Sequence, residues 1–334
     1  MWARVLKLDR VGIHDNFFDL GGHSLLAVRL VSELERALNK RLPVAMLFQF
    51  PTIEQLAGAL FEESLPEKSS LVLIQPVGSK PPFFFVHGDY AYAHFTRYLD
   101  PDQPFYGLAQ HLDGGKVRGR RIEQMANHYI RKVRAVQPEG PYYIGGHSVG
   151  ALVAFEMAQQ LHKDGQKIAL LALLEPATAG DSVAAADHRS IRSRVRQFRR
   201  RTICELYHLL NKSLPPKLES FYVQKIVFPK IYKQAGRNYR PKAYPGRVVY
   251  FKAREDTRDS AAIWQRVAQE GLEVYHVSGD HMSILLDPHV RDLCEKLTIC
   301  LSKAQADKDI ARDTVETWLP TRDTAAQSIE RWRP

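Results

Sequence analysis

The stretch YYIGGHSVGALVAFEMA, residues 142–158, decides the fold of this chain. It opens with three apolar, β-prone residues, continues through two glycines, and then shows a helical apolar pattern from Ala151 to Leu161. A strand that passes through a tight glycine turn into a helix begins a unit in which successive strands lie parallel. The segment Gly146-His147-Ser148-Val149-Gly150 occupies that turn, so a serine is predicted at the end of a buried strand.

Further strands and helices are predicted on both sides of this unit. Short apolar runs lie at residues 83–86, 168–174, 247–252 and 273–277, and a helical pattern covers about residues 288–301. Strands that alternate with helices predict an α/β domain with a mostly parallel sheet covered on both faces. Residues 184–238 interrupt the alternation with helix-like sequence, which predicts a helical insertion, and residues 304–334 are polar and weakly patterned, like a tail.

The N-terminal region has a different pattern. Every fourth residue from Leu26 to Leu38 is leucine, with charged side chains between, as in an amphipathic helix. Thr52 followed by Gln55 predicts a capped start of another helix. Residues 64–80 are rich in Ser, Pro and Lys and are predicted to be a linker. We therefore predict a small all-α domain over residues 1–63 and an α/β domain over residues 81–303.

Composition excludes several classes of protein. Apolar residues make up 45% and charged residues 25% of the 334 positions, as in soluble globular proteins. The three cysteines are too few for a disulfide scaffold, and neither they nor the histidines have the spacing of metal ligands, so we expect a cytoplasmic protein without a metal site. The longest aliphatic run, residues 168–174, is too short to span a bilayer.

A serine nucleophile requires a base and an acid that orients the base. The predicted base is His281, which follows the last predicted strand in Gly279-Asp280-His281-Met282. Two acids remain open at this point, Glu175 after the strand at residues 168–174 and Asp256 after the strand at residues 247–252. The backbone N–H of Val149 would face a developing oxyanion.

A second serine precedes the leucine-rich helix, in Asp19-Leu20-Gly21-Gly22-His23-Ser24-Leu25. At a helix start the Ser24 hydroxyl would lie beside free N–H groups and the positive end of the helix dipole, where an attached phosphate is stabilised. The alternative for a serine at this position is a plain N-cap.

The longer string VGIHDNFFDLGGHSL, residues 11–25, closely resembles the peptidyl or acyl carrier domain of nonribosomal peptide and polyketide synthetases. The resemblance implies a small helical bundle with 4′-phosphopantetheine on Ser24, whose thiol holds the growing chain as a thioester. It also implies as partners a phosphopantetheinyl transferase and either upstream synthetase modules or a loading enzyme that acts in trans. Of the family's first helix we expect only the end, residues 2–6.

Residues 81–302 resemble the type I thioesterase domain that follows the last carrier domain of such synthetases. The matching segments are Phe85-Val86-His87-Gly88, the segment from Gly146 to Ala158, and Gly279-Asp280-His281. The resemblance implies an α/β-hydrolase fold with a helical lid at about residues 184–238. In that family the acid, usually Asp, follows the strand that here ends before Glu175, which favours Glu175 over Asp256.

The thioesterase resemblance also implies a second oxyanion N–H from the loop after His87-Gly88, at Asp89 or alternatively Tyr90. Together the two resemblances predict a terminal unit that transfers an acyl or peptidyl chain to Ser148 and releases it by hydrolysis or cyclisation. Two other functions remain open. One is a general carboxylesterase or lipase with an unrelated helical leader, and the other is a non-catalytic module that docks acyl carriers.

The net charge of +10 comes from one segment. Residues 189–242 hold 15 basic and 2 acidic side chains, a net +13. Aromatic and basic residues do not alternate there as they do in nucleic-acid platforms, so no nucleic-acid partner is expected. The alternatives are a solvated basic helix face, or a surface formed by Arg192, Arg196, Arg199 and Arg200 for an acidic partner, a phosphopantetheine phosphate or an anionic membrane.

Overall fold

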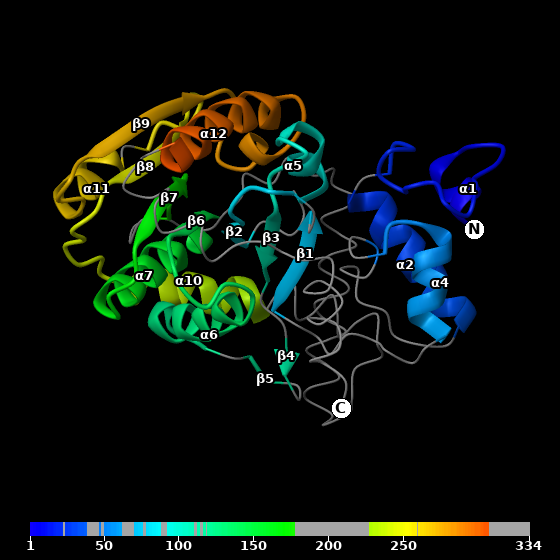
Figure 1. Ribbon diagram of the computed structural model, residues 1–334, viewed down its shortest axis with the longest axis horizontal. Helices are drawn as coiled ribbons and strands as arrows, with labels where there is room; N and C mark the ends of the chain where they lie inside the picture. Colours follow the sequence, from blue (N-terminus) through cyan, green and yellow to red (C-terminus); the bar gives the residue numbers. More distant parts are fainter. Residues whose placement is uncertain are drawn as a thin grey trace.

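The computed structural model describes residues 1–22, 24–38, 47, 50–61, 70–75, 78–87, 92–109, 112–113, 116–117, 119–177, 227–258 and 260–306. These residues form an N-terminal helical unit and an α/β unit built on a seven-stranded sheet (Figure 1). Both predicted classes of architecture, all-α followed by α/β, are therefore confirmed. Among the described residues, no helix combines the length and the apolar character needed to cross a membrane.

The sheet has the strand order β1-β3-β2-β6-β7-β8-β9. The strands are β1 (Leu71–Gln75), β2 (Phe83–Val86), β3 (Phe105–Leu108), β6 (Tyr142–His147), β7 (Ile168–Leu174), β8 (Val248–Ala253) and β9 (Leu272–Val277). Every pairing is parallel except that of β1 with β3. The carboxyl ends of β6, β7, β8 and β9 therefore meet along one edge, where ligand sites of open α/β sheets form. A separate two-stranded ribbon pairs β4 (Leu112–Asp113) with β5 (Lys116–Val117).

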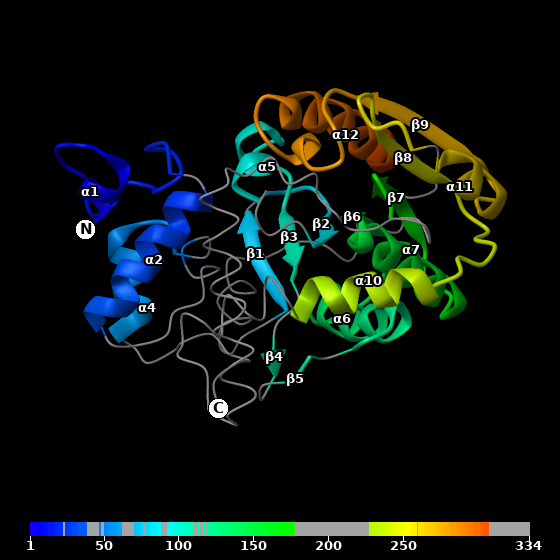
Figure 2. The same cartoon turned by 180° about the vertical axis from the view of Figure 1, so that it is seen from behind.

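Helices cover both faces of the sheet (Figures 1 and 2). The helices of the α/β unit are α5 (Tyr92–Tyr98), α6 (Ile122–Val136), α7 (Val149–Lys163), α10 (Phe228–Asn238), α11 (Ala261–Val267) and α12 (His289–Ala306). One face packs on α6 and α7, and the other packs on α5 and α12. Side chains of β2 alternate between the two cores, with Phe84 and Val86 in the first and Phe83 and Phe85 in the second.

The N-terminal unit contains α1 (Trp2–Leu6), α2 (Ser24–Leu38) and α4 (Ile53–Phe61). Its core is apolar and includes Trp2, Phe17, Leu30 and Leu56, each at most 5% exposed. Leu26, Leu30 and Leu34 of the leucine stripe lie in or against this core, whereas Leu38, at the end of α2, is 48% exposed. Thr52 Oγ1 accepts the N–H of Gln55 at 3.2 Å, which caps the start of α4.

The predicted linker was wrong at its C-terminal side, because residues 71–75 within it form β1. Leu71, Val72 and Leu73 pair antiparallel with β3, and the first two side chains are buried. An apolar run of this length between Pro-, Ser- and Lys-rich stretches resembles a linker, but here a neighbouring strand satisfies its backbone groups. Strand β3 and helices α5, α6 and α11 were not predicted.

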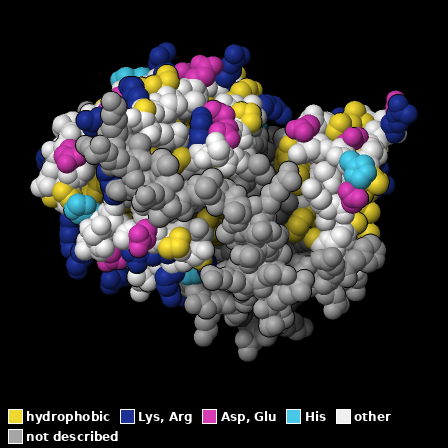
Figure 3. All heavy atoms as spheres, viewed as in Figure 1, with side chains coloured by type: hydrophobic (Ala, Val, Ile, Leu, Met, Phe, Trp, Pro, Cys, Tyr) yellow, Lys and Arg dark blue, Asp and Glu magenta, His cyan; other side chains and the backbone are white. Residues whose placement is uncertain are grey.

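The helical insertion and the tail were predicted largely for residues outside those described. Of residues 184–238, the structure describes residues 227–238, and α10 is the helix there; the four arginines of the basic stretch, Arg192 to Arg200, lie outside. Of residues 304–334, the first three continue α12 to Ala306, and the remainder lies outside. Over α5 and α12 the surface carries basic and acidic side chains side by side (Figure 3), with ion pairs such as Arg97–Asp287.

Candidate active site

Ser148 lies at the turn between β6 and α7. Its backbone adopts φ 56° and ψ −119°, a conformation with positive φ that non-glycine residues rarely take. Backbone hydrogen bonds hold the turn on both sides: the Ser148 N–H donates to the Leu174 carbonyl at 3.0 Å, and the Ala177 N–H donates to the Ser148 carbonyl at 3.2 Å. The turn therefore holds the serine at the carboxyl edge of the sheet.

The glycines on either side of Ser148 are required by close backbone approach. A Cβ on Gly150 would lie 2.2 Å from the Val86 carbonyl oxygen, and a Cβ on Gly146 would lie 2.4 Å from the Gly150 carbonyl oxygen. Both distances are far inside van der Waals contact, and the obstructing atoms are backbone atoms that cannot rotate away. The G-x-S-x-G spacing is thus explained by how tightly the turn packs against itself and against β2.

His281 lies in hydrogen-bonding contact with this serine. Its Nε2 is 3.1 Å from Ser148 Oγ, although 133 positions separate the two residues in sequence. The loop that carries His281 follows β9 and turns at Gly279, which has φ 93°. Asp280 Oδ1 accepts the N–H groups of Met282 and Ser283, so this carboxylate holds the loop itself. The sequence-predicted base and nucleophile are therefore side by side.

Glu175 lies on the other side of the imidazole. Its Oε2 is 3.6 Å from His281 Nδ1, and its side chain is 5% exposed. The other oxygen, Oε1, accepts the backbone N–H of Ala253 at 2.6 Å, which fixes the carboxylate between β7 and β8. His281 Nδ1 is buried without a hydrogen-bond partner among the described residues, so the Glu175 carboxylate is the group placed to receive its N–H. Contacts of this kind commonly tighten when substrate binds.

Asp256, the rival acid, lies beside Glu175. One carboxylate oxygen of Glu175, one of Asp256 and a ring nitrogen of His281 all lie within 4.8 Å of one another. The two oxygens of Asp256 are 2.9 and 3.0 Å from Arg258 Nε, and these hydrogen bonds hold the pKa of the Asp256 carboxyl well below its usual range. Arg258 Nη2 also lies 3.5 Å from Glu175 Oε2. Sequence reasoning missed Arg258, because an arginine two positions after an aspartate carries no distinctive signal.

Two buried histidines, His147 and His87, lie at the ends of the strands next to the site. His147 Nε2 donates to the His281 carbonyl at 2.7 Å, and burial lowers the pKa of His147 to about 3. His87, at the end of β2, has its Nε2 3.1 Å from the Tyr129 hydroxyl, and burial lowers its pKa to about 4. Both rings are therefore neutral at neutral pH. The Tyr232 ring of α10 lies 4.7 Å from the His87 ring, so α10 closes this side of the site.

The predicted oxyanion groups fall partly outside the described residues. Val149 is the first residue of α7, where a backbone N–H has no acceptor within the helix, so its N–H is available beside Ser148. Asp89 and its alternative Tyr90 lie in residues 88–91, which the structure does not describe.

Ser24 is the first residue of α2, fifteen residues long. The turn before it is tight: Gly21 has φ 89°, and a Cβ on Gly22 would lie 2.3 Å from the Phe17 carbonyl oxygen. Gly22 thus packs on the buried Phe17, and Gly21 supplies the positive φ of the turn that precedes α2. A helix start preceded by this glycine turn fits a phosphate ester, because free N–H groups and the helix dipole favour an anion.

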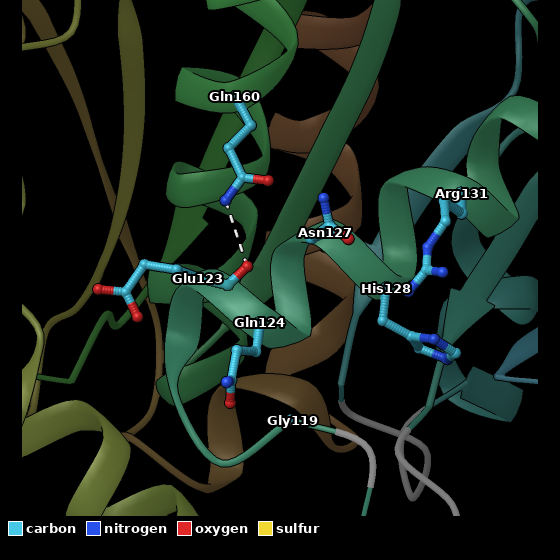
Figure 4. A pocket seen from close by; sticks show the side chains of 7 residues that line it. All are labelled: Gly119, Glu123, Gln124, Asn127, His128, Arg131 and Gln160. Atoms are coloured by element: carbon cyan, nitrogen blue, oxygen red, sulfur yellow. Dashed lines mark hydrogen bonds between the residues drawn. The ribbon is translucent and has the colours of Figure 1, made fainter.

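A cavity of about 550 Å³ lies on α6 and α7 (Figure 4). It is lined by Gly119, Glu123, Gln124, Asn127, His128, Arg131 and Gln160. Gln160, whose Nε2 donates to the Glu123 carbonyl at 3.2 Å, is twelve residues beyond Ser148 along α7. At the rise of an α-helix this is about 18 Å. The cavity is therefore separate from the candidate active site.

The family described as "Thioesterase domain" matches residues 84–299, more than half of the chain. The chain belongs to the thioesterase domain family. In front of the thioesterase domain, residues 1–60 match the family described as "Phosphopantetheine attachment site", so the chain also contains a phosphopantetheine-binding domain. Both resemblances derived from the sequence motifs are thereby confirmed.

Relatives of the thioesterase domain and its carrier occur in large synthetases. The chain is 33% identical over 298 residues to malpinin synthetase of Mortierella alpina. The matched region covers 84% of this chain and 4% of that protein. It is 40% identical over 183 residues to a dimodular nonribosomal peptide synthase of Bacillus subtilis (strain 168), covering 52% of this chain and 8% of the other. The chain thus spans a small part of the length of these relatives.

Two solved structures resemble this chain in fold. One is the NocB thioesterase domain in covalent complex with a fluorophosphonate nocardicin G analog, with a TM-score of 0.52, 25% identity, and coverage of 70% of this chain and all of that one. The other is holo-AB3403, a four-domain nonribosomal peptide synthetase, with a TM-score of 0.56, 23% identity, and coverage of 89% of this chain and 25% of that one.

Proposed function

We propose that this chain is a terminal release unit of nonribosomal peptide or polyketide synthesis, in which Ser148, His281 and Glu175 act as nucleophile, base and acid. The observation that carries the proposal is the 3.1 Å contact between Ser148 Oγ and His281 Nε2 at the strained turn before α7. The phosphopantetheine-binding domain on the same chain supports a thioester as the substrate.

The first half of the reaction forms an ester on Ser148. His281 Nε2 takes the hydroxyl proton as Ser148 Oγ attacks the carbonyl carbon of an acyl or peptidyl thioester. The oxyanion is held by the N–H of Val149 and by an N–H from the loop after His87, which we assign to Asp89. The C–S bond then breaks, and the leaving thiol takes its proton from His281 Nε2.

The second half releases the chain. Water, or a hydroxyl or amine within the chain itself, gives its proton to His281 Nε2 and attacks the ester carbonyl. The bond from this carbonyl to Ser148 Oγ then breaks, and His281 Nε2 returns the proton to Oγ, which releases an acid, a lactone or a lactam and regenerates Ser148. In both halves the Glu175 carboxylate, 3.6 Å from Nδ1, orients the imidazole and stabilises its cationic form.

The carrier domain would bind 4′-phosphopantetheine through Ser24 at the start of α2. When attached, this group supplies the thiol that holds the chain as a thioester. Because relatives such as malpinin synthetase are far longer than this chain, we propose that upstream synthetase modules, or a loading enzyme acting in trans, deliver the substrate. A phosphopantetheinyl transferase is the further partner that this proposal requires.

The proposal is tested by loading the full chain with an acyl-pantetheine group from acyl-coenzyme A and a phosphopantetheinyl transferase. The wild-type protein should lose the acyl group, whereas Ser148→Ala should accept the arm and retain the thioester, as read by intact-protein mass spectrometry. Rapid release by Ser148→Ala would refute the assignment of the nucleophile. Absence of any mass gain on Ser24 would favour a general carboxylesterase instead.

The acid is tested separately. Glu175→Gln should slow release strongly, whereas Asp256→Asn should leave most of the rate near neutral pH, because Glu175 is the carboxylate placed against His281 Nδ1. If Asp256→Asn alone abolished release, Asp256 would be the acid. Labelling of Ser148 by a fluorophosphonate distinguishes a catalytic unit from a non-catalytic docking module.

A further inference from the structure

We propose that Arg258 and Asp256 form a positioning pair that holds the Glu175 carboxylate against His281 and sets the charge that the imidazole experiences. This inference rests on the proposed Ser148–His281–Glu175 triad and goes beyond it. It assigns a role to two residues that do not touch the reacting atoms and act through the acid.

The contacts define the pair. The Arg258 Nε donates to both oxygens of Asp256, at 2.9 and 3.0 Å, and Nη2 also donates to Oδ2. The Arg258 backbone N–H donates to Asp256 Oδ1 at 3.0 Å. The same Nη2 lies 3.5 Å from Glu175 Oε2. Only an arginine fork can bind one carboxylate from two nitrogens and still reach a second carboxylate.

Both carboxylates beside Arg258 are buried, which makes its positive charge important to them. The side chains of Glu175 and Asp256 are 5% and 8% exposed, and two buried carboxylates this close to one another would ordinarily share a proton. An arginine cannot lose its own proton under these conditions, so it supplies a permanent positive charge between them. Arg258 thus compensates the charge of both carboxylates at once, and Glu175 is the acceptor placed for His281 Nδ1–H.

The charges can be added group by group. Glu175 and Asp256 contribute two negative charges and Arg258 contributes one positive charge, so His281 faces a net charge of −1. That is the same charge a lone triad carboxylate would present. Asp256 therefore balances Arg258, and Arg258 balances Asp256; removal of either one alone changes the net charge beside the imidazole.

Among the other ionisable groups facing this cluster from the described residues, Lys252 donates from Nζ to the Arg258 carbonyl. Its positive charge is present in every variant and drops out of a comparison between them. His147, from the end of β6, is neutral because burial lowers its pKa to about 3. Tyr250, from β8, bonds Ser260 Oγ at 2.8 Å, and burial raises the pKa of its hydroxyl. Asp280 is ionised, but its Oδ1 accepts the Met282 and Ser283 N–H groups of its own loop.

The test is a charge cycle measured with the full chain. We would record kcat/KM for p-nitrophenyl butyrate from about pH 5 to pH 9, where a histidine base titrates. Arg258→Gln leaves an uncompensated carboxylate, which favours the imidazolium and should move the acidic limb to higher pH by about one unit. Asp256→Asn leaves an uncompensated guanidinium and should move the limb to lower pH by about one unit. Asp256→Asn/Arg258→Gln restores the net charge, so its limb should return to the wild-type position.

Three controls make the outcome decisive. Arg258→Lys keeps the charge and should keep the limb, which also covers the case in which Arg258→Gln fails to fold. Arg254→Gln removes one exposed positive charge from the same loop and should shift nothing. Ser148→Ala should abolish hydrolysis and fluorophosphonate labelling; if it does not, the proposed function itself fails.

The inference alone fails if Ser148→Ala is inactive but neither Arg258→Gln nor Asp256→Asn moves the acidic limb. It also fails if both single variants lose rate equally at every pH and the double variant loses more, because that is the behaviour of residues that merely hold the fold. Opposite shifts that cancel in the double variant would establish the positioning pair.

Discussion

The tetrapeptide Gly-Gly-His-Ser occurs twice in this chain, at residues 21–24 and 145–148, in two different surroundings. The second copy ends a strand that pairs with parallel neighbours on both sides, and its serine takes φ 56° before α7 begins. The first copy follows a turn, takes its positive φ of 89° at Gly21, and leads into α2. The same four residues thus lead into a helix in both units, but the positive φ falls on the serine in one copy and on a glycine in the other.

The difference lies in what packs against each copy. Around Ser148 the backbone of β2 comes so close that the residue two positions later must be glycine. In the first copy Gly22 is the residue in close contact, with Phe17 of a helical core, and the residue two positions after Ser24 is Leu26, which packs on that core. The serine at the edge of the sheet, Ser148, therefore has a strained backbone. The serine of the helical unit, Ser24, is the first residue of a helix.

The largest expected effect separates the two serines by activity. Ser148→Ala should lower the hydrolysis of p-nitrophenyl butyrate by about 10³-fold or more, because the nucleophile is removed. Ser24→Ala should abolish the mass gain of one phosphopantetheine, while hydrolysis of this small ester, which does not use the arm, persists. The comparison breaks down if Ser24→Ala and Ser148→Ala lose the same activity.

The next effect compares the residues two positions after each serine. Gly150→Ala brings a methyl group to 2.2 Å from the Val86 carbonyl oxygen, so the backbone must shift, and we expect a loss of about 3 kcal/mol in the free energy of unfolding. Leu26→Ala removes apolar atoms from a half-buried site and should cost about 1 to 2 kcal/mol. Urea unfolding followed by circular dichroism measures both, and equal losses would contradict the packing difference.

A third effect is the response of stability to acid. His147 and His87 have pKa values of about 3 and about 4 in the folded protein, below the value near 6.5 of an unfolded chain. The unfolded state therefore binds the extra protons first, and their stabilising contribution, complete above about pH 6.5, is lost as pH falls towards the folded values.

Each of these buried histidines should contribute a slope of up to about 1.4 kcal/mol per pH unit in that window. His147→Asn should remove one such slope. Urea unfolding at several pH values between 5 and 7 measures the slope; an unchanged slope for His147→Asn would show that this ring is not neutral when folded.

The smallest effect concerns helix capping. Ser148 occupies the N-cap position of α7 without a side-chain cap, so Ser148→Ala should change the free energy of unfolding by less than about 0.5 kcal/mol. Thr52 does cap α4, and Thr52→Ala should cost about 1 kcal/mol. Thermal melting of both variants tests this, and a strongly destabilised Ser148→Ala would show that Ser148 has a structural role.

Much of the architecture could be predicted from local patterns. The strands at residues 83–86 and 168–174 lie where the sequence placed them, because buried parallel strands are continuous apolar runs bounded by polar residues. Strand β1 was missed, because its short run lies among linker-like residues and becomes a strand through its pairing with β3. Domain limits other than this one remain predictions.

The candidate site was predictable in part for the same reason. Ser148, Glu175 and His281 each follow a strand of one parallel sheet, so their meeting at one edge follows from the order of strands and turns. The sequence presented Glu175 and Asp256 as rivals, since each follows a neighbouring strand. The structure places them side by side, with Glu175 Oε2 3.6 Å from His281 Nδ1. Arg258, which contacts both carboxylates, was not singled out by sequence reasoning.

The sequence by itself determined the serine turn, the helix start at Ser24 and the classes of both domains, because each depends on residues close together in the chain. Only the tertiary structure decided the surroundings of the base: Arg258 reaches Glu175 across 83 positions, and His147 reaches the His281 carbonyl across 134. Such contacts depend on which strands become neighbours and in what register, and distances between remote side chains leave no periodic trace in the sequence.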